Sequence, residues 1–373
     1  MNPILEIQLI SIIIAISCSL CGTFLVLKKM AMMSDSISHT ILLGIVVAFF
    51  IVRDINSPIL ILGAAIVGVI TVWLSETLTN TNLVREDSAI GIIFPLLFSI
   101  AIILITLYAD NIHLDSDSVL LGEISFTPFN RLIINNIDLG PKSIYTGFSL
   151  LIINIIFIIL FYKELIVTTF DPILSKAIGI SPIIIHYVLM GVISITAVGS
   201  FESVGSILVV AFMVTPSIIS SILTNNLKYI LLFNILISII TGILGCQLAL
   251  YFDINIGGTM TIILGIIFIL VFIFSPNKGL FSNFILKLNQ KKSFADLTLL
   301  MHIYNHQNHK DVYEENGIKT VATHLNWKQN KLNASIKRLI NQDNIIIKQE
   351  IITLTTKGNK LIEYNIDNLL NTN

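Results

Sequence analysis

The stretch ILEIQLISIIIAISCSLCGTFLVL, residues 4–27, decides the class of fold. It contains a single charged side chain, Glu6, and Lys28-Lys29 follow it. A helix needs about 20 apolar residues to cross roughly 30 Å of hydrocarbon, and this run is long enough. It is too long for the core of a signal peptide, and no small-residue cleavage site follows it. The run therefore predicts a retained transmembrane helix.

Further apolar runs of similar length fill the first three-quarters of the chain. Apolar residues make up 54% of the whole sequence and charged residues 12%, which excludes a soluble globular protein for this part. A backbone in lipid must satisfy its own hydrogen bonds, so the runs are expected to be helices. We predict nine spans, at residues 4–27, 33–52, 58–78, 88–108, 144–162, 183–200, 204–223, 229–250 and 256–275.

The charge balance changes near residue 280. Residues 1–280 carry 10 Lys/Arg and 15 Asp/Glu, whereas residues 281–373 carry 12 and 8. The chain is therefore predicted to be an all-α polytopic membrane protein of about nine transmembrane helices with a small α/β domain at its C-terminus. The expected organisation is a transmembrane domain at 1–280, a linker at 281–293 and a domain at 294–373.

Orientation follows from the basic residues, which concentrate on the cytoplasmic side of membrane proteins. With nine spans, most lysines and arginines of the first part lie on one side, and Glu202 and Asp253 lie on the other. This predicts an external N-terminus and a cytoplasmic tail. Residues 113–143 are expected to form an outer loop with a partly buried or interfacial piece. Arg53, Arg131 and Lys142 do not follow the rule. The basic residues on the predicted inner side are Lys28, Lys29, Arg85, Lys163, Lys176, Lys228 and Lys278. Acidic residues on the predicted outer side also include Asp110, Asp115 and Asp117.

Asp35 and His39 are the strongest chemical signal. They are four residues apart within the second span, so they project from the same face of a helix. Ionisable residues inside a membrane are costly and usually functional. A carboxylate with an imidazole suits Mn²⁺ or Zn²⁺, and two ligands predict a transient site that is open to other ligands. The alternative is a helix N-cap Asp with a structural His.

The segment from Asp171 to Gly179 reads as a short capped helix between two spans. Asp is favoured at the N-cap, Pro at the first helical position and Gly just past the end. In DPILSKAIG these are Asp171, Pro172 and Gly179, and the helix carries Ile173 and Ala177. A rigid cytoplasmic helix could couple the membrane domain to a partner, and an ordinary surface helix is equally consistent.

Pro216 falls inside a span, where a proline removes one backbone hydrogen bond and kinks the helix. A gating hinge and a static kink both remain open. The three cysteines, Cys18, Cys21 and Cys246, lie in apolar runs and are interpreted as packing residues.

The chain contains no G-x-x-x-x-G-K-[ST] phosphate-binding loop. If it is driven by ATP, hydrolysis must belong to a separate polypeptide. The chain by itself is therefore interpreted as no enzyme, and no permanently bound cofactor is expected.

Four motifs, in order, resemble the permease family of zinc/manganese ABC importers over about residues 8–281. They are DSISHTILLG (35–44), TTFDPILSKAIGI (168–180), SVGSILVVAFMVTP (203–216) and FSPNKGL (274–280). One departure is SPIIIH (181–186), whose His186 is interpreted as an interfacial residue and not a ligand.

The resemblance carries several implications for function. Asp35 and His39 would contact a passing divalent ion, and residues 168–180 would dock on an ATPase. Two permeases, identical or paralogous, would pair in a bacterial plasma membrane. A cytoplasmic ATPase dimer would drive them, and an extracellular metal-binding protein would deliver the ion. The motifs do not distinguish manganese, zinc and iron.

The tail has its own periodicity. Helices are predicted at 294–306, around 318–325, at 332–340 and at 358–370, with short strands at 345–347 and 351–354. This order resembles a winged-helix domain, and ITLTTKG (352–358) is similar to the wing of iron-type metal-dependent repressors. Lys328, Lys331 and Arg338 share one side of a helix, which fits a DNA reader or a solvated basic face.

Four of the seven histidines lie in this tail: His302, His306, His309 and His324. The spacing of the first three lets one helix present them together, as a cytoplasmic metal sensor would require. A polar helix end is the other interpretation. Two further functions stay open for the whole chain, an ion-coupled secondary metal transporter and a membrane-anchored, metal-responsive transcription regulator.

Overall fold

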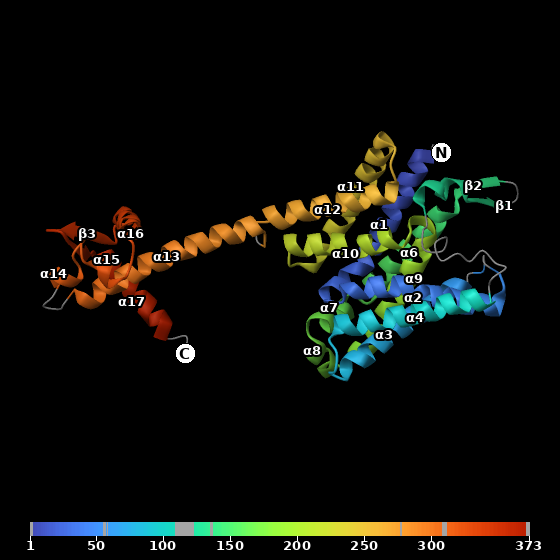
Figure 1. Ribbon diagram of the computed structural model, residues 1–373, viewed down its shortest axis with the longest axis horizontal. Helices are drawn as coiled ribbons and strands as arrows, with labels where there is room; N and C mark the ends of the chain where they lie inside the picture. The colour runs from blue at the N-terminus through green and yellow to red at the C-terminus, as the bar shows by residue number, and fades with distance from the viewer. Residues whose placement is uncertain are drawn as a thin grey trace. The chain divides into compact units, whose positions relative to one another are not determined.

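The computed structural model describes residues 3–54, 57, 59–108, 123–134, 137–276, 278–307 and 312–370. The chain divides into two compact units, Met1–Gly279 and Leu280–Asn373 (Figure 1). The first unit is a helical bundle, and the second is a mostly helical unit with one β-hairpin.

Nine helices in the described part of the chain are long and apolar enough to cross a membrane. This confirms the nine predicted spans, and the bounds differ from prediction by a few residues. They are α1 (Pro3–Leu27), α2 (Ala31–Val52), α3 (Ile59–Asn80), α4 (Glu86–Tyr108), α6 (Lys142–Leu160), α9 (Pro182–Val204), α10 (Ser206–Leu223), α11 (Leu227–Phe252) and α12 (Ile256–Phe274).

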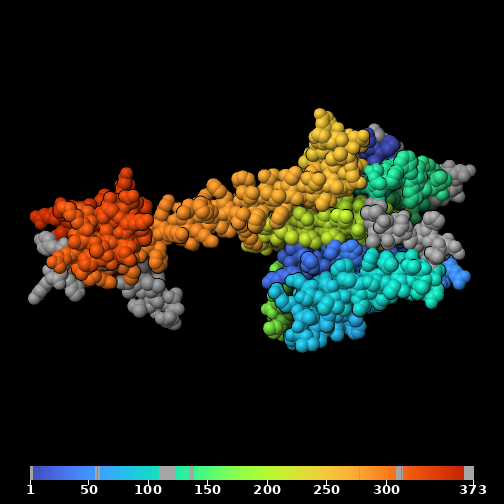
Figure 2. All heavy atoms as spheres, viewed as in Figure 1, coloured from blue at the N-terminus to red at the C-terminus, as the bar shows by residue number. Residues whose placement is uncertain are grey.

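Helix α1 forms the centre of the bundle and packs against α6, α9, α10 and α11. In its most apolar window 72% of the residues are buried, against 17% in α4. Cys18 and Cys21 lie in this buried interior, as the packing interpretation expects. Helices α3 and α4 cover one face of the unit (Figure 2), and their outward side chains, such as Leu62 and Ile103, are apolar and exposed. That is the surface expected to meet lipid.

Buried polar side chains join the central helices. Asn234 of α11 donates hydrogen bonds to Thr23 Oγ1 of α1 (2.7 Å) and to Ser217 Oγ of α10 (3.2 Å). Its Oδ1 accepts a hydrogen bond from Ser220 Oγ at 2.5 Å. Hydrogen bonds of this kind hold membrane helices together where the hydrophobic effect cannot.

Pro216 lies beside this network. Helix α10 continues through the proline, and the hydroxyls of Ser217 and Ser220 donate to the carbonyls of Met213 (3.2 Å) and Pro216 (2.9 Å). The proline is buried, and the helix that carries it packs against α1, α11 and α12. Its role as a hinge stays a prediction.

Gly22 allows the closest approach of α1 to α10. A Cβ atom at Gly22 would lie 2.0 Å from the backbone oxygen of Met213, a distance at which backbone must move. On α12, a Cβ at Gly265 would meet no atom within 4 Å.

We therefore expect Gly22→Ala to destabilise the bundle by about 1–3 kcal/mol, the usual cost of overpacking a core. Gly265→Ala is the matched control and should be neutral or slightly stabilising, because Ala favours helix. Thermal unfolding of the two variants in the same detergent makes the comparison. Equal melting temperatures would contradict the close approach.

The short elements before α6 lie near the N-terminus, at the opposite end of the bundle from α8 (Pro172–Ala177) (Figure 1). They are η1 (Ile124–Phe129), β1 (Arg131–Ile134) and β2 (Ile137–Pro141), and β1 and β2 pair antiparallel. Ile124 is buried, so the described part of this loop has the partly buried piece that was predicted. Asp110, Asp115 and Asp117 lie outside the described residues.

Arg131, which did not follow the charge rule, is held by carboxylates. Its guanidinium lies 2.6 Å from Asp138 Oδ2 and 3.5 Å from Oε1 of the buried Glu6. The hydrogen bond to Asp138 is the main cause that raises the pKa of Arg131 and lowers the pKa of Asp138. The two carboxylates thus compensate the charge of this arginine locally.

The second unit contains the helices and the hairpin predicted from the sequence of the tail, but the lengths of the elements differ from the prediction. They are α13 (Leu280–His306), α14 (Val312–Glu315), α15 (Val321–His324), α16 (Gln329–Asn341), β3 (Ile345–Lys348), β4 (Ile351–Leu354) and α17 (Thr356–Leu370). Leu299, Ile303, Leu332 and Ile352 are fully buried in its core. Residues 281–293, expected as a linker, lie within α13.

The three basic residues singled out on α16 and just before it have different environments. Arg338 donates two hydrogen bonds to the carboxylate of Asp296 on α13, at 2.6 and 2.9 Å. Lys331 Nζ lies 3.9 Å from the ring centroid of Trp327, and Lys328 precedes the helix. Arg338 therefore has a structural task inside the unit, which weakens the interpretation of this side as a DNA reader.

Candidate functional site

Asp35 and His39 lie on one face of α2, as their spacing predicts. Asp35 Oδ1 and His39 Nε2 are 3.7 Å apart. Two donor atoms that each lie about 2.1 Å from one metal ion can be at most about 4.2 Å apart, so this pair fits a shared ion. Met30 is the N-cap of α2, so the alternative interpretation of Asp35 as the N-cap residue is wrong.

The surroundings of the pair are aromatic on one side and open on the other. The His39 ring lies 5.5 Å from the ring of Phe94 and 6.1 Å from that of Phe98, both on α4. The side chains of His39 and Asp35 are 36% and 49% exposed on this single chain. The packing against α4 orients the imidazole, while about a third of the His39 side chain stays exposed.

Helix α8 has both predicted caps. The side chain of Asp171 accepts a hydrogen bond from the Leu174 backbone N–H (2.9 Å), and Pro172 opens the helix. At the other end Gly179 has φ +84°, and the Ile180 N–H donates to the Ser175 carbonyl at 3.0 Å. This is the Schellman arrangement that ends many helices.

The side chains of α8 expose an apolar surface. Ile173 is 82% exposed, and Leu174, Ala177 and Ile178 are also exposed. Only Ser175 is buried in this helix, and its hydroxyl donates to the Ile180 carbonyl. The caps and this hydrogen bond give α8 a rigid shape, so its apolar side chains project in fixed directions.

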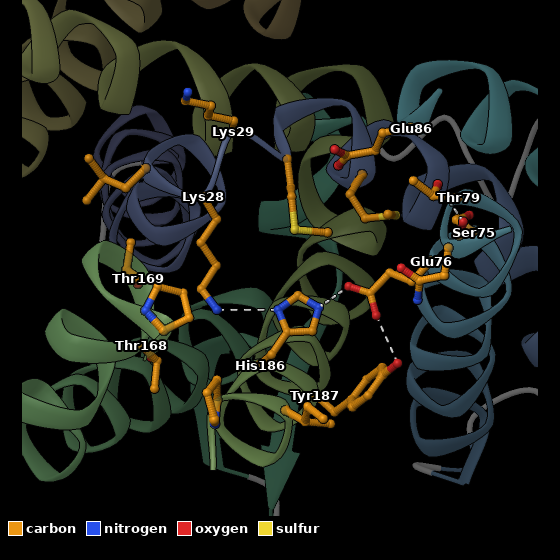
Figure 3. A pocket seen from close by; sticks show the side chains of 17 residues that line it. Lys28, Lys29, Ser75, Glu76, Thr79, Glu86, Thr168, Thr169, His186 and Tyr187 are labelled. Atoms are coloured by element: carbon orange, nitrogen blue, oxygen red, sulfur yellow. Dashed lines mark hydrogen bonds and ion pairs between the residues drawn. The ribbon is translucent and has the colours of Figure 1, made fainter. Parts of the chain in front are cut away.

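A cavity of about 630 Å³ opens at the α8 end of the bundle (Figure 3). Its walls come from the ends of α1 and α3, the starts of α2, α4 and α9, and from α7 (Tyr162–Phe170) and α8. Pro172 of α8 lines it, so the candidate coupling helix borders this cavity directly.

A chain of polar contacts crosses the cavity (Figure 3). Lys28 Nζ lies 3.4 Å from His186 Nδ1, and His186 Nε2 lies 2.6 Å from Glu76 Oε1. The Tyr187 hydroxyl donates to Glu76 Oε2 at 2.8 Å. Burial lowers the pKa of the Lys28 ammonium, and attraction to Glu76 opposes that shift. The contacts link the residue that follows α1 to α3 and α9.

Sequence reasoning missed this network. His186 was interpreted as an interfacial residue, and in the structure its side chain is 12% exposed and contacts Lys28 and Glu76. Lys28 entered the prediction only as a topological charge. The available signal was that Glu76 and His186 are ionisable residues within apolar runs, at the ends of two different spans. Their pairing depends on how α3 and α9 pack together.

In the tail, the structure brings together three of the four histidines that were singled out. His302 and His306 lie on α13, and His324 ends α15. Glu315, which the sequence did not single out, lies between them. His309 lies outside the described residues.

The comparisons with known proteins agree on the class of the chain. The family model of the ABC 3 transport family matches residues 2–275. The zinc transport system membrane protein TroD of Treponema pallidum (strain Nichols) is 36% identical over 363 residues, which cover 97% of this chain and 99% of that protein. The match therefore includes most of the tail.

Two further comparisons cover the bundle. The manganese transport system membrane protein MntD of Bacillus subtilis (strain 168) is 39% identical over 284 residues, which cover 76% of this chain and 96% of that protein. A solved structure, PsaBC from Streptococcus pneumoniae in complex with Fab, has a TM-score of 0.62 and 24% identity, and covers 74% of this chain and 94% of that chain.

That likeness in structure supports the fold of the bundle. The family model spans most of the chain, and the two named relatives share more than a third of their aligned residues with it. This multi-pass membrane protein belongs to the ABC 3 transport family.

Proposed function

We propose that this chain is the membrane-spanning permease subunit of an ATP-driven importer for a divalent metal ion, manganese, zinc or iron. The observation that carries the proposal is the Asp35–His39 pair, whose donor atoms are 3.7 Å apart inside a membrane-length helix. Carboxylate oxygen and imidazole nitrogen together suit these ions. The ion is the cargo, and two protein ligands hold it weakly enough to let it move on.

A second permease, identical or paralogous, is proposed to cover this pair. Asp35 and His39 are half to one-third exposed on the single chain. An ionised side chain that faces lipid costs about 2.5–3.5 kcal/mol on insertion scales. Pairing of two permeases over α2 and α4 would replace lipid by protein and water, and would place a metal pathway between the two chains.

The proposed motor is a cytoplasmic ATPase dimer that docks on α8. Residues Asp171, Pro172, Ile173, Ala177 and Gly179 belong to or cap this helix, and its exposed apolar side chains suit a groove on a partner. The cavity beside α8 and the Lys28–His186–Glu76 contacts give a physical connection from that helix to three membrane spans. This coupling segment favours the ABC permease over a secondary transporter, which needs no ATPase.

The proposed orientation has the N-terminus outside and the tail in the cytoplasm of a bacterial plasma membrane. Lys28, Lys29 and Arg85 lie between spans at the α8 end of the bundle, which supports a cytoplasmic location for that end. An extracellular metal-binding protein would then deliver the ion to the end that carries β1 and β2. Pro216, inside the packed core, is kept as a candidate hinge.

The tail is proposed to be a winged-helix-like domain at 294–373. The order α15, α16, β3, β4, α17 supports this, since helices followed by a hairpin and a helix form such domains. Arg338 is engaged by Asp296, which speaks against nucleic acid as the partner of this domain. A membrane-anchored regulator is the alternative function. The match to a transport family and the nine membrane-length helices in the described part of the chain favour a transporter instead.

Uptake measurements test the proposal. Cells that lack this chain, with and without a plasmid copy, are given radioactive Mn²⁺, Zn²⁺ or Fe²⁺ separately at low external concentration. We expect cells without the chain to lose uptake of at least one ion. The plasmid copy should restore that uptake only in cells whose partner ATPase is intact. Full uptake without the ATPase would favour a secondary transporter.

A further inference from the structure

Four metal-ligating side chains meet in the tail, far along the sequence from the transport pair. One ligand atom each from His302, His306 and Glu315 lie within 4.8 Å of one another. The rings of His302 and His306 are 4.7 Å apart. His324 Nδ1 lies 3.3 Å from Glu315 Oε2, so a fourth ligand borders the group.

Rigid elements hold these side chains. His302 and His306 are one turn apart on α13, and Ile303, one of the three residues between them, is fully buried in the core. The segment after Glu315 is tied to β4, since the Ile352 N–H donates to the Asn316 carbonyl at 3.0 Å. A site on fixed helices and strands keeps its geometry without a ligand.

The burial and orientation of the group fit metal binding. The side chains of His302 and Glu315 are 12% and 27% exposed, so water competes only partly for them. His302 Nε2 lies 3.0 Å from the Glu315 backbone carbonyl, an acceptor, so this nitrogen donates and Nδ1 is the ring nitrogen left to bind a metal. Metal-binding histidines are commonly oriented by such a bond.

We propose that His302, His306 and Glu315, with His324 as a fourth ligand, bind a divalent first-row metal ion, zinc more tightly than manganese. Two imidazoles and one carboxylate are a ligand set of protein zinc sites, and donors around one ion lie up to about 4 Å apart, so the three atoms need to approach by roughly an ångström. The general order of affinities places zinc well above manganese for such ligands.

The binding itself does not depend on the transport proposal. The physiological use of the site does depend on that proposal. With the proposed orientation, the site lies in the compartment into which the ion is delivered. Its occupancy would then follow the cytoplasmic level of the metal, and helix α13, which begins just after the last span, would carry the bound ion at its end.

The test uses the full chain in detergent with Asp35→Asn and His39→Gln present, so that the transport pair contributes no binding. Zn²⁺ is titrated by equilibrium dialysis, and Co²⁺ is followed by its visible absorption. We expect one tightly bound ion per chain and the strong bands of tetrahedral Co²⁺. Glu315→Gln and His306→Gln should each weaken binding roughly tenfold or more. Binding should also fall from about pH 7 to about pH 5.5, because protonated imidazole cannot bind metal.

Glu314→Gln is the matched control, because Glu314 is the exposed neighbour of Glu315 and loses the same charge. Its affinity should equal that of the parent chain. The melting temperatures of all variants without metal show whether the tail remains folded. A parent chain without bound zinc, or a folded Glu315→Gln variant with unchanged affinity, would overturn the proposal and leave an ion-paired histidine cluster.

Discussion

Asp35→Asn and His39→Ala are each expected to reduce metal uptake to the level of cells without the chain. Each change removes one of the two ligands that this chain offers at the pair, whose donor atoms are 3.7 Å apart. The first variant would keep a side-chain oxygen but lose the charge that attracts a cation, and the second would lose the imidazole. Removing even a supporting group commonly costs 10–100-fold in metal affinity, so the loss of a ligand should be at least as large.

The measurement is initial uptake of radioactive metal, together with the amount of chain in the membrane and the ATPase that copurifies with it. Both amounts should stay near wild type, because the two side chains are partly exposed. Asp253→Asn is the control for the same chemical change. Asp253 has φ +54°, a conformation that asparagine tolerates well, so uptake should remain normal. Normal uptake in either pair variant would remove the site assignment.

Ile173→Asp should separate the chain from its ATPase. Ile173 is 82% exposed and contributes to the apolar surface of α8, so its replacement should hardly change the stability of the fold. Placing a carboxylate in an apolar contact without a counter-charge costs a few kcal/mol, roughly 100-fold in affinity. Ala177→Asp tests the same surface one turn further along the helix. Copurification of a tagged ATPase measures the association, and metal uptake should fall with it.

Leu83→Asp gives a matched control for that surface. Leu83 is 84% exposed, apolar, and lies in the connection between α3 and α4 at the same end of the bundle. It should copurify with the ATPase as the wild-type chain does. If Ile173→Asp retains the ATPase at wild-type yield while uptake is unchanged, α8 is an ordinary surface helix.

Much of the fold could be read from the sequence, because the constraint behind it is local. A run such as residues 4–27 must be a helix in lipid wherever its neighbours lie, since its backbone has no other hydrogen-bond partners. The caps of α8 follow in the same way from Asp171, Pro172 and Gly179, which act on backbone groups within a few residues. The face shared by Asp35 and His39 needs only the helical repeat.

Contacts between distant segments could be found only in the tertiary structure. The sequence does not say that Glu76 meets His186, that Asn234 joins three helices or that Glu315 lies beside His302 and His324. In each case the partners are on different elements, and their meeting depends on which helix faces pack together. An apolar run has many faces that could pack, so helix rotation and neighbours are set by side-chain fit, such as the close approach at Gly22. That fit is a property of two helices together, whereas the local sequence signals used for prediction describe each helix separately.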